Sequence, residues 1–465
     1  MDKTISIGFV ALIVFAALSH GVVEPWSELV FVLWVAMLIL LWLIKAIREK
    51  RLLLCLPSTI WPLAAFFALG VAQSFAFQDQ DGYRHSLSLD VEATRGTALL
   101  CGCLLLCAVL AANFLAHRER LQSLARFLTI FGLLLASFAL IQHFTWNGRF
   151  YWLRPAETDV PFGPFVNRNH FAGYMELLLP WPVALLLMCR RREEKIFYGF
   201  AAAWMAAAAI FSLSRGGMIS IFAELIFLAA LSPRGASGDA PGAVASRSRA
   251  GLLAVRGGVI IAILSVGAAT LGGLVWLGAE RIVNRLATGQ EATQGRAAEQ
   301  SFAASRGELW RDSWAVFRAH PVIGVGLGAF ATAFPAHNQS RNSELVTTQT
   351  HNDYLQVLTD GGLIGFLIAL WFLAATGRAV RRGLRAHEPF MRLAVLACGA
   401  GIFGLLVHSL FDFNLQLPAH ALLFLTFAAV AAQLSELATA LAPIRVPIPV
   451  VTPEPIILTQ RNQEV

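Results

Sequence analysis

Charged residues are scarce in this chain of 465 residues. Asp, Glu, Lys and Arg make up 14% of it, against roughly 25% in an ordinary soluble domain, whereas 57% of the residues are hydrophobic. So few charges cannot cover so much apolar surface, and the composition therefore excludes a soluble enzyme and a disordered chain. A bilayer core of about 30 Å needs about 20 apolar residues per helix, so we expect a membrane protein.

Lysine and cysteine are also rare. Only four of the 36 basic residues are Lys, and the basic residues are spread over short loops, so the net charge of +7 does not indicate a nucleic-acid partner. The six cysteines all lie in or beside apolar runs, and Cys101, Cys103 and Cys107 do not have the spacing of a zinc site. We expect no disulfide, no metal site and no cofactor.

Long apolar runs dominate the rest of the sequence. They predict an all-α, polytopic membrane helix bundle with about 12 transmembrane helices and a partly helical outer loop. The predicted spans are 5–23, 28–45, 52–77, 96–115, 124–143, 171–189, 195–213, 216–232, 257–279, 357–377, 391–411 and 418–437.

The basic residues in short loops predict the orientation of these spans. They fall in alternate connections, beginning with Lys45–Arg51 and Arg118–Arg126, and this face should be cytoplasmic with both termini beside it. The predicted divisions are N-terminal spans at 1–143, central spans at 144–279, an outer loop at 280–356, C-terminal spans at 357–437 and a disordered cytoplasmic tail at 438–465.

Arg215 stands between two apolar runs with almost no loop, in Phe211-Ser-Leu-Ser-Arg-Gly-Gly217. An arginine near the bilayer boundary is costly unless it faces water, a counter-ion or a ligand. The pattern therefore leaves two interpretations open, a ligand-binding arginine and an arginine that snorkels to water from a tight hairpin.

The outer loop contains a predicted amphipathic helix at about 297–319, with Leu309, Trp310, Trp314 and Phe317 at helical spacing. Either its basic face is solvated at the membrane interface, or Arg306 projects into an anionic site. The glycine-rich run 321–330 follows. No strand precedes it and no Lys-Ser/Thr pair follows it, so it predicts a re-entrant or tight turn rather than a nucleotide loop.

The segment Thr350-His-Asn-Asp-Tyr-Leu-Gln356 leads into the tenth span. It predicts a helix on which His351 and Tyr354 share a face, and His351 is either a proton acceptor or a structural cap. Weaker candidates lie beside the other spans at this end of the bundle: Arg168, Asn169 and His170 before the sixth span, Asn352 and Asp353 beside His351, and Asp412 after the eleventh span.

The Ser-Arg-Gly-Gly hairpin, the Arg306 helix with its glycine run, and the His351-Asn-Asp-Tyr-Leu-Gln segment occur in this order in a polytopic chain. This arrangement resembles the O-antigen ligase and O-antigen polymerase superfamily over about residues 160–415. The resemblance implies a bacterial inner-membrane glycosyltransferase with a periplasmic active site.

Members of that superfamily transfer a glycan from undecaprenyl diphosphate to an acceptor. The resemblance assigns the functional arginines of the ligases to Arg215 and Arg306, as ligands of the donor diphosphate, and the functional histidine to His351. Arg168, His170, Asn352, Asp353 and Asp412 are candidate supporting residues. The implied partners are the lipid-linked donor, a glycolipid such as lipid A-core or a glycan as acceptor, and membrane lipids, with no cofactor or metal.

Two alternatives remain open. The motifs do not separate a ligase from a Wzy-like polymerase of O-antigen or exopolysaccharide. A lipid-glycan flippase or transporter also needs many spans, although polar residues near the midplane would then be expected. In this sequence the polar outliers collect at one face, which favours an enzyme.

Overall fold

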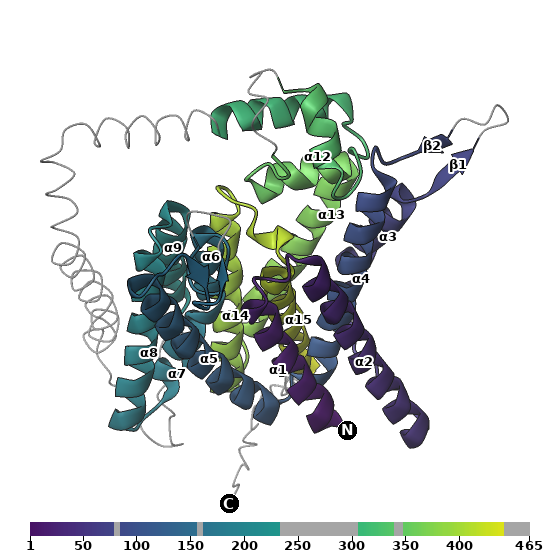
Figure 1. Ribbon diagram of the computed structural model, residues 1–465. Helices are drawn as coiled ribbons and strands as arrows, with labels where there is room; N and C mark the ends of the chain where they lie inside the picture. Colours follow the sequence, from purple (N-terminus) through teal and green to yellow (C-terminus); the bar gives the residue numbers. More distant parts are fainter. Residues whose placement is uncertain (79–83, 156–160, 233–305, 339–346, 441–465) are drawn as a thin grey trace, which may run out of the picture.

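The computed structural model describes residues 1–78, 84–155, 161–232, 306–338 and 347–440. Within these ranges the chain is a helical bundle with two short hairpins, β1 (Ala76–Gln78) with β2 (Arg84–Ser86) and β3 (Arg149–Phe150) with β4 (Arg154–Pro155). The long helices run between two ends of the bundle (Figure 1). The all-α prediction is confirmed.

The N-terminal helices are α1 (Asp2–Leu18), α2 (Pro25–Glu49), α3 (Ile60–Gln73), α4 (Val91–Phe114) and α5 (Arg118–Phe144). The central helices are α6 (Arg168–Leu178), α7 (Pro180–Met188), α8 (Arg192–Phe211) and α9 (Arg215–Leu231). The C-terminal part has a helix at 306–319, α12 (Phe330–Ala333), η1 (Phe334–Ala336), α13 (Asp353–Gly383), α14 (Pro389–His408), η2 (Asn414–Gln416) and α15 (Pro418–Ala440).

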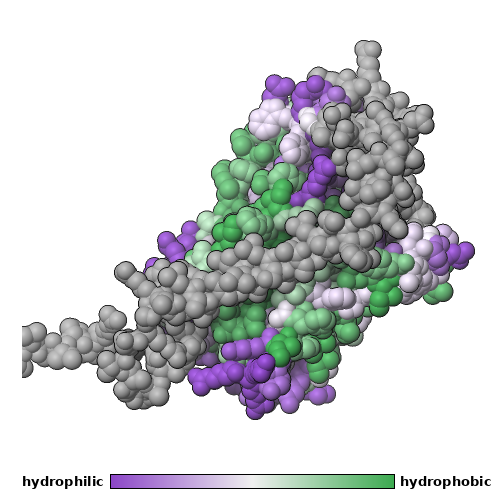
Figure 2. All heavy atoms as spheres, turned by 90° about the vertical axis from the view of Figure 1, so that its left-hand side faces the viewer, coloured by the Kyte–Doolittle hydropathy of each residue, from purple (hydrophilic) through white to green (hydrophobic). Residues whose placement is uncertain are grey.

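Eight helical segments in the described residues are long and apolar enough to cross a membrane, with α6 and α7 joined as one. On the face in Figure 2, hydrophobic residues occupy the middle of the bundle and hydrophilic residues gather at its ends. The predicted third span, 52–77, is wrong in extent because its helix is only Ile60–Gln73. Pro57 precedes the helix, and proline disfavours helical geometry in the residue before it. The predicted ninth span, 257–279, lies outside the described residues.

The centre of the bundle is formed by α14 and α15. Helix α14 packs against α6, α7, α9 and α15, while α15 also packs against α4 and α13. Small residues on α14 allow these close contacts: a Cβ at Gly401 would lie 3.2 Å from the Cα of Leu177 in α6. The start of α9 and the end of α14 are therefore held side by side, and they begin the candidate site.

Candidate active site

Four helix ends meet at one end of the bundle. The start of α9 contacts the start of α6, because a Cβ at Gly217 would lie 2.6 Å from the Cβ of Ala172. The start of α13 is bound to the end of α14, since the backbone N–H of Asp353 donates to the carbonyl of Ser409 at 3.0 Å. Helix ends that are far apart in the sequence thereby lie together at this end of the bundle (Figure 1).

Asp412 lies at the centre of this group. Its carboxylate accepts hydrogen bonds from Asn169 Nδ2 at 2.6 Å and from the backbone N–H of Phe413 at 2.9 Å. His351 Nδ1 lies 3.3 Å from Asp412 Oδ1. Asp412 has a side chain that is only 1% exposed, whereas that of His351 is 29% exposed. The pair thus joins a buried carboxylate to an imidazole that reaches the surface.

The electrostatics of Asp412 favour its charged form. Burial by itself raises the pKa of this carboxyl, but the hydrogen bond with His351 and the nearby ring of His170 bring the pKa below its ordinary value. An ionised carboxylate only accepts hydrogen bonds, so Nδ1 of His351 carries the hydrogen. The Nε2 atom of His351 is then the nitrogen that can take up a proton.

The predicted helical face shared by His351 and Tyr354 is wrong. His351 precedes the helix and has a positive φ of 51°, and α13 begins at Asp353. Asn352 is the N-cap, because its side chain accepts from the backbone N–H of Leu355 at 3.1 Å. A left-handed backbone costs a non-glycine residue roughly 1–2 kcal/mol. The cap and this turn direct the His351 ring toward Asp412 instead of along the helix.

The neighbouring residues of the His351 segment have structural contacts. Asp353 is buried, and its carboxylate accepts from Ser409 Oγ at 2.7 Å and from the backbone N–H of Leu415 at 3.1 Å. The side chain of Asn352 also donates to the carbonyl of Leu410 at 3.2 Å. Asp353 and Asn352 therefore attach the start of α13 to the connection that carries Asp412.

Arg306 is the first described residue of helix 306–319 and is partly buried. Burial lowers the pKa of its guanidinium, and the charge of Asp412 opposes this effect. The guanidinium remains charged, because arginine is not deprotonated in proteins. Trp310 Nε1 donates to the carbonyl of Thr350 at 3.1 Å and so binds this helix beside His351. The structure thus places Arg306 within electrostatic reach of Asp412.

Arg215 and Arg168 each begin a helix at the same end. Arg215 is exposed at the start of α9, where the Ser214 side chain caps the helix by accepting from the N–H of Gly217 at 3.1 Å. Arg168 is partly buried at the start of α6, which Asn167 caps. His170, one turn into the bundle, packs its ring against Phe413 at 4.9 Å between centroids.

The glycine-rich run forms the tight turns that the sequence predicted. Gly324, Gly326 and Gly328 all have positive φ values. Their segment docks on α13: the N–H groups of Gly326 and Gly328 donate to the carbonyl and the carboxylate of Asp360, at 3.0 Å each. These N–H groups already have acceptors, so this loop supports α13 rather than cradling a phosphate.

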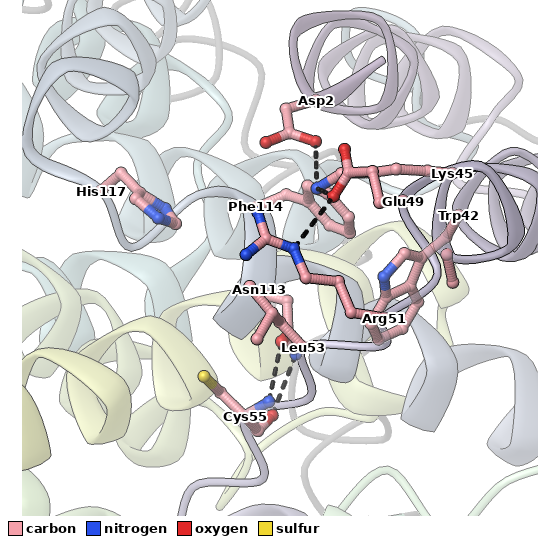
Figure 3. Close-up of a pocket in the computed structure, with 11 residues that line it drawn as sticks. Asp2, Trp42, Lys45, Glu49, Arg51, Leu53, Cys55, Asn113, Phe114 and His117 are labelled. Carbon is pink, nitrogen blue, oxygen red and sulfur yellow. Dashed lines mark hydrogen bonds and ion pairs between the residues drawn. The ribbon is translucent and has the colours of Figure 1, made fainter.

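A cavity of about 160 Å³ lies at the opposite end of the bundle (Figure 3). It is lined by the start of α1, the end of α2 and the end of α4, among them Asp2, Lys45 and Asn113. Lys45 is paired with Asp2 at 2.5 Å and lies 3.9 Å from Glu49. No residue of the His351–Asp412 group contributes to this cavity, so it is a separate feature.

The site therefore unites most of the residues that the sequence singled out. His351, Asp412 and Arg306 form one electrostatic group, and Arg168, His170 and Arg215 lie at the adjacent helix starts. The sequence indicated Asn169 only as a weak candidate and did not predict its contact with Asp412. Its only signal was the polar run Asn167-Arg-Asn-His170 before an apolar span.

Comparison with known proteins gives one match. Residues 200–370 match the family model described as O-antigen ligase, and this segment contains Arg215, Arg306 and His351. Asp412 and Asn169 lie outside it. No curated protein matches this chain. The match over residues 200–370 supports the resemblance of this helical membrane protein to the O-antigen ligase and Wzy-like superfamily.

Proposed function

We propose that this protein is a membrane glycosyltransferase of the O-antigen ligase type. It moves a glycan from undecaprenyl diphosphate to an acceptor hydroxyl, with lipid A-core or a related glycolipid as the acceptor. The observation that carries the proposal is the His351–Asp412 pair, which lies at one end of a membrane bundle within electrostatic reach of Arg306. His351 and Arg306 belong to the segment that matches this family.

Arg215 and Arg306 bind the diphosphate of the donor in this proposal. A guanidinium presents a planar set of donors that matches phosphate oxygens, and it stays charged when partly buried. Arg215 is exposed at a helix start, where backbone N–H groups and the helix dipole add to the attraction for an anion. Both arginines then offset the charge that develops on the departing diphosphate.

His351 is the proposed general base. The acceptor oxygen attacks the anomeric carbon, the bond from that carbon to the phosphate oxygen breaks, and the hydroxyl proton passes to Nε2 of His351. Asp412 orients the ring through Nδ1 and stabilises the imidazolium that forms. The glycosyl phosphate bond of the donor supplies the free energy, so the proposed reaction needs no cofactor and no metal.

We further propose that this end of the bundle faces the periplasm of a bacterial inner membrane and that both termini are cytoplasmic. The support is the basic composition of the other end, where Arg118 begins α5 and lies 3.7 Å from Glu388, and Lys45 lies near the end of α2. Labelling of cysteines placed at Ser305 and at Arg192 from each side of the membrane tests this orientation. Exclusive labelling of position 305 from the cytoplasm would reverse it.

The activity is tested with purified protein in vesicles that contain a defined undecaprenyl-diphosphate glycan. With lipid A-core present, a ligase makes a glycan-bearing lipid A-core. With donor alone, a Wzy-like polymerase makes longer lipid-linked glycans. If neither product forms while the donor moves between leaflets, the flippase alternative is correct and the glycosyltransferase proposal is wrong.

A further inference from the structure

Two buried residues behind the start of α9 have no part in the proposed chemistry. His408 ends α14 and Glu176 lies within α6, and their side chains are 1% and 0% exposed. His408 Nδ1 lies 2.8 Å from Glu176 Oε1. This bond fixes the plane of the imidazole, whichever group supplies the hydrogen.

The His408 ring lies directly against the first turn of α9. A Cβ built at Gly216 would lie 2.8 Å from Cδ2 and 2.9 Å from Nε2 of His408. Cβ atoms do not approach other atoms so closely, so the α9 backbone and the ring are in contact only because residue 216 is glycine. On its other side this turn meets α6, where Gly217 packs on Ala172.

Arg215 is the chain neighbour of Gly216 and the first residue of α9. Its backbone therefore has little freedom, because the next two residues are enclosed by α14 and by α6. Arg215 itself is exposed. A shift of the His408 ring would displace the base of the Arg215 side chain.

We propose that His408, held by Glu176, is a positioning residue for the donor: it sets the first turn of α9 and thereby the place of the Arg215 guanidinium. The inference rests on the proposed function, in which Arg215 binds the donor diphosphate. A misplacement of about 1 Å can cost on the order of 100-fold in a positioned interaction. Arg215 holds the phosphate before transfer and offsets the charge that develops on it during transfer, so misplacement raises KM for the donor and lowers kcat/KM.

Gly216→Ala is the central test. The added methyl group must displace either the His408 ring or the start of α9, and we expect donor KM to rise about tenfold and kcat/KM to fall by at least as much. The same substitution in an Arg215→Ala background should produce no further rise in KM, since nothing is left to position. Equal rises in both backgrounds would contradict the proposal.

The Glu176 variants separate positioning from packing. Glu176→Gln keeps an oxygen that accepts from Nδ1 of His408 and should retain donor KM, whereas Glu176→Leu releases the ring and should raise it. A lowered Tm with unchanged donor KM in both Gly216→Ala and Glu176→Leu would mean that the pair is only structural. Glu224→Gln is the matched control, since Glu224 is also buried on α9 but faces Gly404 instead of His408.

The outcomes also separate this inference from the proposed function. If Arg215→Ala leaves donor KM unchanged, Arg215 is not a donor ligand and the proposed donor site is wrong. If Arg215→Ala raises donor KM while Gly216→Ala does not, the donor site stands and the positioning role of His408 is overturned.

Discussion

The charged side chains at the two ends of the bundle differ in how deeply they are buried. At the end with the cavity, Asp2 forms ion pairs with Lys45 (Figure 3) and with Arg120, and these side chains are between 16% and 37% exposed. At the other end, Asp412 is 1% exposed and binds three donors from three segments of the chain. Ion pairs that water reaches contribute little to the free energy of folding, and one partner can replace another. A buried carboxylate, by contrast, is destabilised by the loss of any of its hydrogen-bond partners. Function is therefore expected where the charge is buried and a group beside it reaches the surface.

The largest effect is expected for His351→Ala. Loss of a positioned base should lower glycan transfer by about 10²–10⁴-fold, while donor binding and folding are retained. Transfer, donor binding and Tm are measured on the same purified variant. A well-folded variant with near-normal transfer eliminates the base assignment.

Replacement of the arginines should have the next largest effect. Hydrogen bonds to charged groups contribute about 1.5–3 kcal/mol, and the bidentate contact of a guanidinium belongs at the upper end. Arg215→Ala and Arg306→Ala should therefore each weaken donor use by about 100-fold. The Lys variants keep the charge but lose the fork of donors, and they should lie between wild type and Ala. Wild-type donor affinity in both Ala variants would show that neither residue binds the diphosphate.

Asp412→Asn should have a smaller effect on transfer, about tenfold, because the amide oxygen can still accept from His351 while the charge is lost. The pKa of Asp412 is below its ordinary value in the folded protein. Its charge therefore contributes stability above the ordinary pKa of about 4, and that stability is lost as the pH falls through the folded value. The difference in Tm between wild type and Asp412→Asn should narrow at acidic pH, and a constant difference would contradict this account.

The smallest effect is expected at the opposite end of the bundle. Asp2→Asn removes the partner of Lys45 and Arg120, and it should change the free energy of unfolding by less than about 1 kcal/mol. Glycan transfer should be unchanged. A large loss of transfer in this variant would show that the two ends are coupled, and the comparison between them would no longer hold.

Apolar runs predicted most of the helices, because the hydropathy of a transmembrane helix depends only on consecutive residues of the chain. Arg118–Phe144 and Pro389–His408 lie close to their predicted ranges. The pattern was less informative where helix ends depend on neighbours. His351 was predicted on a helical face, but it precedes the helix. Asn352 caps α13 after it and binds the α14–η2 connection. The predicted domain divisions and the count of 12 spans stay predictions.

The sequence by itself determined that the chain is a membrane bundle and that Arg215, Arg306 and His351 are the residues to test, because hydropathy and short motifs are local. Only the tertiary structure decided that His351 meets Asp412, 61 residues away, and that Asn169 meets the same carboxylate from 243 residues away. Such pairs depend on which helix faces pack together. A buried carboxylate without hydrogen-bond partners raises the free energy of the folded state. The contacts of Asp412 with His351 and with Asn169 therefore depend on each other.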